Sequence, residues 1–231
     1  MPDKKVKTMG QCAQCGLETT ERICMTPDGK GSKNCPTLLQ KETLAEANRE
    51  YQNDDTYQFA QMASIQEADC YANRDQQPYI MQPSKTRLVE IYEFAEKMSY
   101  RRLGLAFCIG LAKEAQIVEK ILEDQGFEVI SVLCKAGRTP KEMIGITDRD
   151  KIYRGTDEAM CNPIFQAKSL NRAGTELNIL LGLCVGHDSL FFKYAQAPTT
   201  VLAVKDRVTG HNPLAAIYLS DSYYRKIKHS Q

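Results

Sequence analysis

Short apolar segments alternate with helical segments through the second half of the chain, and this alternation constrains the fold more than any other feature. The four apolar segments cover residues 103–108, 127–134, 175–184 and 199–206. Apolar strands that are separated by helices of ten to fifteen residues form parallel βαβ units. The sequence therefore predicts an α/β fold with a small, open, mostly parallel sheet of about four strands and flanking helices.

The chain before these segments differs in composition and divides into two parts. Residues 1–40 are polar, with four cysteines and too few apolar residues for a core, which indicates a cysteine-rich metal-binding knuckle. Residues 41–100 carry helical patterns and are expected to form a helical segment packed on the core. We therefore predict three parts, with the α/β domain at residues 101–231.

Charge and hydropathy exclude several functional classes. The 231 residues include 30 Lys and Arg against 29 Asp and Glu, so the net charge is +1. A near-neutral chain has no overall field for gathering nucleic acid or anionic lipid. The longest uncharged apolar stretches have about ten residues, about half of what a membrane-spanning helix needs. We expect neither nucleic acid nor a membrane as a partner, and the sequence indicates no oligomeric state.

The nine cysteines are the most informative residues for function. The N-terminus is basic at first, but no apolar segment follows, so we expect no secretory signal and a cytoplasmic location. Disulfides rarely persist in that compartment, and an odd number of cysteines cannot pair fully within one chain. Clustered cysteines there indicate metal ligands or reactive thiols.

The first cysteine group is Cys12, Cys15, Cys24 and Cys35. The close pair can hold one side of a metal ion, and the following loops bring the other two thiolates round. Tetrahedral sites of four thiolates suit zinc or an iron–sulfur cluster, and the spacing does not decide between them. The alternative is that these are four unliganded thiols.

The second group lies at the carboxyl ends of predicted strands. Cys108, Cys134 and Cys184 each end a strand, and Cys161 precedes a helix that begins at Pro163. Carboxyl ends of parallel strands lie at one edge of a sheet, and neighbouring strands are about 4.8 Å apart. These thiols can therefore share one metal, cluster or active site if their strands are neighbours, but the sequence leaves the strand order open. The alternative is that they are small buried apolar residues.

Polar residues are expected at the same edge. His187 follows the third strand, Lys205 ends the fourth strand, and His211 lies in the loop after it. These residues are candidates for substrate binding and proton transfer, together with the thiols of Cys134 and Cys184. No nucleotide-binding or hydrolase motif accompanies them, because the sequence has no G-x-G-x-x-G, P-loop, H-E-x-x-H or G-x-S-x-G.

The order of these motifs resembles that of a known family. The pieces that carry the resemblance are Cys12-Ala13-Gln14-Cys15, Cys24, Asn34-Cys35-Pro36-Thr37, Cys161-Asn162-Pro163, GLCVGHDSLF at 182–191 and VKDRVTGHNP at 204–213. The chain is similar to the uncharacterised, predicted metal-binding proteins of domain-of-unknown-function family 1847, which occur mainly in anaerobic bacteria and archaea. The resemblance implies metal binding through the cysteines, and it implies no particular reaction.

Three functions stay open from the sequence. The first is a metal-binding protein with zinc or an iron–sulfur cluster at the N-terminal cysteines, a second metal, cluster or active site at the strand edge, and a role in redox chemistry. The second is a thiol enzyme with one structural zinc, in which Cys134 or Cys184 is the nucleophile and His187 or His211 is its base. The third is a non-enzymatic sensor or adaptor stapled by metal. The first two functions would require a small-molecule substrate or a redox partner.

Overall fold

The computed structural model describes residues 10–229, and the chain divides into two compact units. The first unit extends to Ile65 and the second begins at Gln66. The division falls inside helix α3 (Asp54–Asp69), so the predicted helical segment 41–100 is shared between the two units.

The first unit is short of buried side chains. Its elements are the 3₁₀ turns η1 (Cys12–Gln14) and η2 (Thr19–Glu21), the helices α1 (Pro36–Leu39) and α2 (Lys41–Glu50), and the start of α3. No residue from 10 to 65 is buried. This agrees with the scarcity of apolar residues in the first 40 positions, because a segment without apolar side chains cannot form a core of its own.

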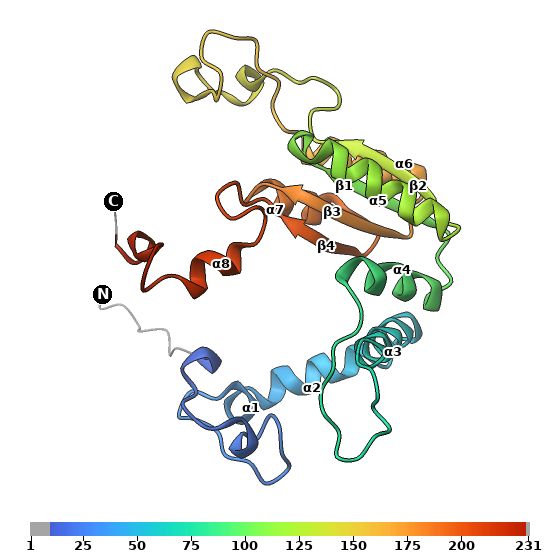
Figure 1. The fold of residues 1–231 in the computed structure, drawn as a ribbon, viewed down its shortest axis with the longest axis vertical. Helices are drawn as coiled ribbons and strands as arrows, with labels where there is room; N and C mark the ends of the chain where they lie inside the picture. Colours follow the sequence, from blue (N-terminus) through green and yellow to red (C-terminus); the bar gives the residue numbers. More distant parts are fainter. Residues whose placement is uncertain (1–9, 230–231) are drawn as a thin grey trace. The chain divides into compact units, whose positions relative to one another are not determined.

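The second unit contains a four-stranded sheet in the order β2-β1-β3-β4, and every neighbouring pair is parallel (Figure 1). Its strands are β1 (Arg102–Phe107), β2 (Glu128–Leu133), β3 (Leu177–Leu183) and β4 (Thr199–Val204). Its helices are α4 (Arg87–Lys97), α5 (Ala112–Asp124), α6 (Pro163–Ala173), α7 (His187–Tyr194) and α8 (Pro213–Tyr218). Four 3₁₀ turns complete it: η3 (Ile109–Leu111), η4 (Lys141–Ile144), η5 (Asp148–Asp150) and η6 (Arg225–Lys228). The predicted α/β fold with a small parallel sheet is confirmed.

Helices cover both faces of this sheet. On one face, α4 and α5 pack against β1 and β3, and the buried members include Ile91, Val118, Leu122, Leu105 and Ile179. On the other face, α6 and α7 pack against the sheet, and the buried members include Ala167, Leu170, Phe191, Ala106 and Leu180. Each fully buried large apolar side chain contributes about 1.5–3 kcal/mol, so the two clusters stabilise the packing of the sheet against its helices.

None of the helices in the described part of the chain is long and apolar enough to cross a lipid bilayer.

The long connection between β2 and α6 is held together by hydrogen bonds and an ion pair to the buried carboxylate of Glu158. This carboxylate accepts hydrogen bonds from the Ile152 and Tyr153 N–H groups at 2.9 and 3.2 Å. It also pairs with Lys141 Nζ at 2.8 Å. The contact with Lys141, helped by the two N–H groups, lowers the pKa of the Glu158 carboxyl below its usual value. The ionised form of Glu158 therefore stabilises the folded connection between β2 and α6.

We expect the variant Glu158→Gln to melt a few degrees below the wild type near neutral pH. The carboxyl pKa is lower in the folded than in the unfolded chain, so its contribution is complete above the unfolded value of about 4.3 and is lost as the pH falls through the folded value. The difference in Tm should accordingly shrink between pH 5 and pH 3, which a series of thermal melts can measure. Glu142→Gln is the control, because Glu142 pairs with Lys151 through a half-exposed side chain and should have a smaller effect. A difference that does not change with pH would contradict this account.

Candidate functional site

The strand order brings three predicted site cysteines to one edge of the sheet. Cys134 follows β2, Cys108 follows β1 and Cys184 follows β3, and these three strands are neighbours. The connection after β1 runs to β2 on one side, whereas the connection after β3 runs to β4 on the other side. The two connections therefore diverge between the neighbouring strands β1 and β3. In open α/β sheets, ligands bind in the crevice at such a switch point, outside the carboxyl ends of the strands. The condition that the sequence left open for a shared site is therefore met.

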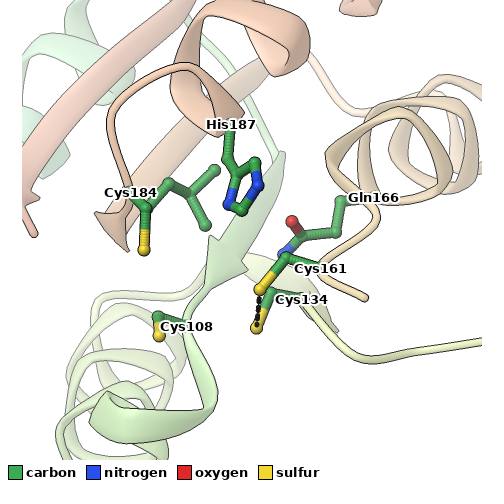
Figure 2. A pocket seen from close by; sticks show the side chains of 7 residues that line it. Cys108, Cys134, Cys161, Gln166, Cys184 and His187 are labelled. Atoms are coloured by element: carbon green, nitrogen blue, oxygen red, sulfur yellow. Dashed lines mark hydrogen bonds between the residues drawn. The ribbon is translucent and has the colours of Figure 1, made fainter. Parts of the chain in front are cut away.

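A shallow pocket lies at this edge, and the space among its walls is about 190 Å³ when the adjoining open solvent is included. Its walls come from the residues that follow β1, β2 and β3, and from the start of α6 and of α7. Figure 2 shows the side chains that line it. The lining residues are Cys108, Cys134, Cys161, Gln166, Leu183, Cys184 and His187. Four of the nine cysteines and one of the three histidines thus lie around one pocket.

Cys134 is the central thiol of the pocket, and the ends of two strands fix its position. Its N–H donates to Phe107 O at 2.9 Å, which extends the pairing of β1 with β2 by one residue and sets Cys134 level with Cys108. Its sulfur accepts a hydrogen bond from the Ile109 N–H at 3.4 Å and lies 3.8 Å from the Cys161 sulfur. Hydrogen bonding with Cys108 and Cys161, together with burial, raises the pKa of Cys134, so this thiol keeps its proton.

Cys161 is held at the start of α6, beside His187. The side chain of Asn162 caps the helix by accepting from the Phe165 N–H at 2.9 Å, and the Asn162 N–H donates to Cys134 O at 2.8 Å. Hydrogen bonding with Cys134 and then with His187 lowers the pKa of Cys161 to about 4, against the opposing effect of burial. The same contact with Cys161 raises the pKa of His187. The pair can therefore exist as a thiolate beside an imidazolium.

Cys108 is the second activated thiol, and Lys205 lies beside it. Hydrogen bonding with Cys134 lowers the pKa of Cys108 to about 5, with help from the Gly110 N–H and from Lys205. The Lys205 ammonium reaches from the end of β4 across the end of the sheet: Nζ lies 3.5 and 3.6 Å from the positions that a Cβ would take on Gly110 and Gly182. The predicted strand-end lysine therefore lies beside the thiol site.

Cys184 faces a different partner. Arg207, in the loop after β4, donates from its guanidinium to the Cys184 sulfur at 3.3 Å. Figure 2 shows the Cys184 sulfur on the opposite side of the pocket from the Cys134–Cys161 pair. His211, the other predicted histidine, is not among the residues that line the pocket. Its Nδ1 accepts from the Asp206 N–H at 3.1 Å, so this histidine closes the turn after β4.

Gln166 is a pocket residue that the sequence did not reveal. It is fully buried on α6, and its Nε2 donates to Phe107 O at 3.2 Å and to Val132 O at 2.7 Å. It thereby ties together the ends of β1 and β2, from which Cys108 and Cys134 follow. The available signal was a polar side chain on the apolar face of a helix, three residues after Pro163 and one turn before Leu170. Arg207 was also missed, because nothing in the sequence distinguishes it from a solvated arginine.

The first cysteine group lies in the other unit, on an exposed segment. Cys12 and Cys24 are exposed, and Cys15 and Cys35 are half-buried. The Gln11 N–H donates to Asn34 O at 3.4 Å, so the residues just before Cys12 and Cys35 are adjacent. Burial would raise the pKa of Cys35, but hydrogen bonds from Leu38 and Thr37 at the start of α1 outweigh it and lower this pKa.

The donor sets can be compared with the needs of a metal ion. Within residues 10–229, no three His, Cys, Asp or Glu side chains already surround a point that could hold a metal. The strand-edge cysteines nevertheless fit a thiophilic metal in chemistry and in proximity. Zinc–sulfur bonds are about 2.3 Å long, so two thiolates on one tetrahedral ion lie about 3.8 Å apart. The sulfurs of Cys134 and Cys161 have this separation, at 3.8 Å.

Comparisons with known proteins are consistent with the motif analysis. The family described as "Protein of unknown function (DUF1847)" matches residues 35–202. The chain belongs to this family. The resemblance found in the sequence motifs is therefore confirmed, and it carries no assigned reaction.

Two further proteins are similar to this member of the family. An uncharacterized protein of Methanocaldococcus jannaschii, MJ0455, is 42% identical over 216 residues, which cover 94% of this chain and 96% of that protein. The crystal structure of Dph2 from Pyrococcus horikoshii is similar with a TM-score of 0.34 and 15% identity over 63% of this chain. The match spans 33% of the Dph2 chain, about a third of its length.

Proposed function

We propose that this protein binds metal through cysteine thiolates at two sites, in a reducing cytoplasm where thiols stay available. The observation that carries the proposal is the convergence of Cys108, Cys134, Cys161 and Cys184 with His187 on one pocket. These residues come from four separate parts of the chain, so their meeting is a product of the fold. At the N-terminus, Cys12, Cys15, Cys24 and Cys35 would hold a second metal, which would supply the stabilisation that the missing core cannot.

The chain's own residues support thiolate ligation at the strand edge. The low pKa values of Cys108 and Cys161 make two ligands available without a large cost of deprotonation. Lys205 and Arg207 bring positive charge to the sulfurs of Cys108 and Cys184, which offsets the negative charge of the thiolates. Because no three donors of the described residues surround one point, at least one cysteine side chain would have to rotate on binding.

The bound group decides the chemistry. A zinc ion would supply Lewis acidity, whereas an iron–sulfur cluster would transfer electrons. The 3.8 Å separation of the Cys134 and Cys161 sulfurs favours two thiolates on a single ion at the strand edge, and metal binding would displace the Cys134 proton.

Metal analysis of protein purified without oxygen tests the proposal. We expect two metal-binding sites per chain, detected as zinc, or as iron with acid-labile sulfide and a broad absorption in the visible region. One zinc per chain in a colourless solution would confine metal to the N-terminal cysteines and would contradict the strand-edge site. A protein that binds no metal at all would refute both sites.

The contact between Cys161 and His187 favours a second candidate, a thiol enzyme. The nucleophile would be Cys161 rather than Cys134, because the pKa of Cys134 is raised. The Cys161 thiolate would attack an electrophilic carbonyl carbon and form a C–S bond. The leaving group would depart with the bonding electrons and take a proton from the His187 imidazolium.

In the metal-free protein, we expect Cys161 to be alkylated by iodoacetamide at pH 5.5 about tenfold faster than free cysteine. At pH 5.5, the thiolate fraction of a thiol with a pKa near 4 is about a thousandfold larger than that of free cysteine, whose pKa is near 8.5. The less basic thiolate is about a hundredfold less nucleophilic, so the net gain in rate is about tenfold. Mass spectrometry of the modified peptide identifies the residue. His187→Gln should slow the alkylation of Cys161. Uniformly slow alkylation of all cysteines would refute the thiol-enzyme candidate.

A further inference from the structure

The pocket contains a buried oxygen that no group of the described chain satisfies. Gln166 is fully buried, and its Nε2 donates to two backbone carbonyls, Phe107 O and Val132 O. Carbonyl oxygens only accept, so the amide can point only one way, with nitrogen toward the strands. In residues 10–229, Oε1 then has no hydrogen-bond partner. A buried acceptor without a donor is rare in native proteins and indicates a missing ligand or water.

This oxygen belongs to the pocket wall. Gln166 lines the pocket together with Cys161 and His187, and Figure 2 shows its amide end directed toward the space between them. A ligand that carries an O–H or N–H group would satisfy the oxygen. The other end of such a ligand would face the opposite wall, where Cys108 and Cys184 lie.

Two cations approach the cysteines of that opposite wall from the end of β4 and the loop after it. Lys205 lies near Cys108 and helps to lower the pKa of its thiol, and Arg207 donates to the Cys184 sulfur at 3.3 Å. No carboxylate of the described chain lies within ion-pair distance of either cation. An ammonium has three donors and a guanidinium has five, so one sulfur partner each leaves both cations with free donors. Arg207 follows Lys205 by two residues, and a guanidinium suits a carboxylate, whose two oxygens match its planar fork.

We propose that the strand-edge pocket binds a small carboxylate that carries a hydroxyl or amino group on a neighbouring carbon. The carboxylate lies against Lys205 and Arg207, and the O–H or N–H group donates to Gln166 Oε1. This site goes beyond the proposed metal function, because it depends on three residues that are not metal ligands.

Glycolate and acetate form the matched pair of probes, since they differ in one hydroxyl group. Ligand-observed NMR on the full chain as purified measures both dissociation constants. We expect glycolate to bind about three- to tenfold more tightly than acetate, which is the range for one hydrogen bond to a neutral acceptor. Equal affinities would mean that water occupies the Gln166 oxygen and would overturn the proposal. Tighter binding of inorganic phosphate than of glycolate would overturn the assignment to a carboxylate.

Three variants assign the contacts. Gln166→Met should abolish the advantage of glycolate and leave acetate binding unchanged, whereas a purely structural effect would weaken both probes equally. Lys205→Met should weaken both probes about fivefold or more, and Lys193→Met, at an exposed lysine on α7 beside Tyr194, should change neither. If Gln166→Met does not fold, the wild-type ratio of glycolate to acetate and the Lys205→Met result decide the question.

The metal proposal and this one can fail separately. The titrations are repeated after chelation, beside a metal analysis of the same sample. Absence of metal with retained glycolate binding refutes the strand-edge metal alone. Absence of glycolate binding in both the metal-loaded and the chelated protein refutes this inference alone.

Discussion

Replacement of Cys134 by serine is expected to remove one metal site from the protein and to leave the N-terminal site intact. Cys134 is the central thiol: it interacts with both Cys108 and Cys161 and is 2% exposed. Loss of this sulfur takes away the only thiol that contacts two others in the described pocket. Quantification of metal per chain, on protein purified without oxygen, measures the effect directly.

Two matched variants make this result interpretable. Cys70→Ser replaces another buried cysteine of the same unit, whose sulfur bonds Gln66 O at 3.0 Å, and serine can make the same bond. It should keep the full metal content. Cys15→Ser should remove the other metal and leave the strand-edge metal in place. Wild-type metal content in Cys134→Ser would contradict a metal at the strand edge.

The elements of the α/β unit were predictable because their patterns are strong. The predicted strand at 103–108 is β1 at Arg102–Phe107, and the predicted strand at 199–206 is β4 at Thr199–Val204. Continuous apolar runs of this length fit strands that are buried on both faces, and the pattern of β3 is buried at all seven positions. The caps are equally local: Asn162 caps α6 with its own side chain.

The strand order was not predictable from the same patterns. A β-strand pattern reports burial but not which strand is next to which, and the shared cysteine site depends on β1 lying between β2 and β3. The division of the chain at Ile65 was also hidden, because α3 continues through it with a single helical pattern.

The sulfurs of the site, His187 and Lys205 were predictable from their places after strand ends, but Gln166 and Arg207 were not. His187 and His211 both follow strand ends and are equivalent in the sequence. The structure separates them, because His187 lines the pocket at the start of α7, whereas His211 turns back to bond the Asp206 N–H. Gln166 and Arg207 act through tertiary contacts with Val132 O and the Cys184 sulfur, which leave no trace in local sequence.

Alanine at Gly182 is expected to destabilise the α/β unit by about 2–5 kcal/mol. Gly182 has φ of +70°, which costs an L-residue about 1–2 kcal/mol. A Cβ there would lie 2.2 Å from Leu111 Cδ1, a buried core atom, and such overpacking costs about 1–3 kcal/mol. The residue marks the irregular register between β3 and β4, just before Cys184. Urea unfolding measures the loss of stability, and metal analysis of the same variant should show a weakened strand-edge site.

The two causes of this destabilisation can be separated by comparison and by rescue. Gly126→Ala places alanine at φ of +90° with no atom within 4 Å, so it should cost only the strain of about 1–2 kcal/mol. In the double variant with Leu111→Ala, the clash at residue 182 disappears, because the leucine side chain that caused it is gone. The double variant should therefore be more stable than the sum of the two single effects by about 1–3 kcal/mol. Strict additivity would show that Leu111 relaxes freely, and the bulge at Gly182 would then be required for its backbone conformation alone.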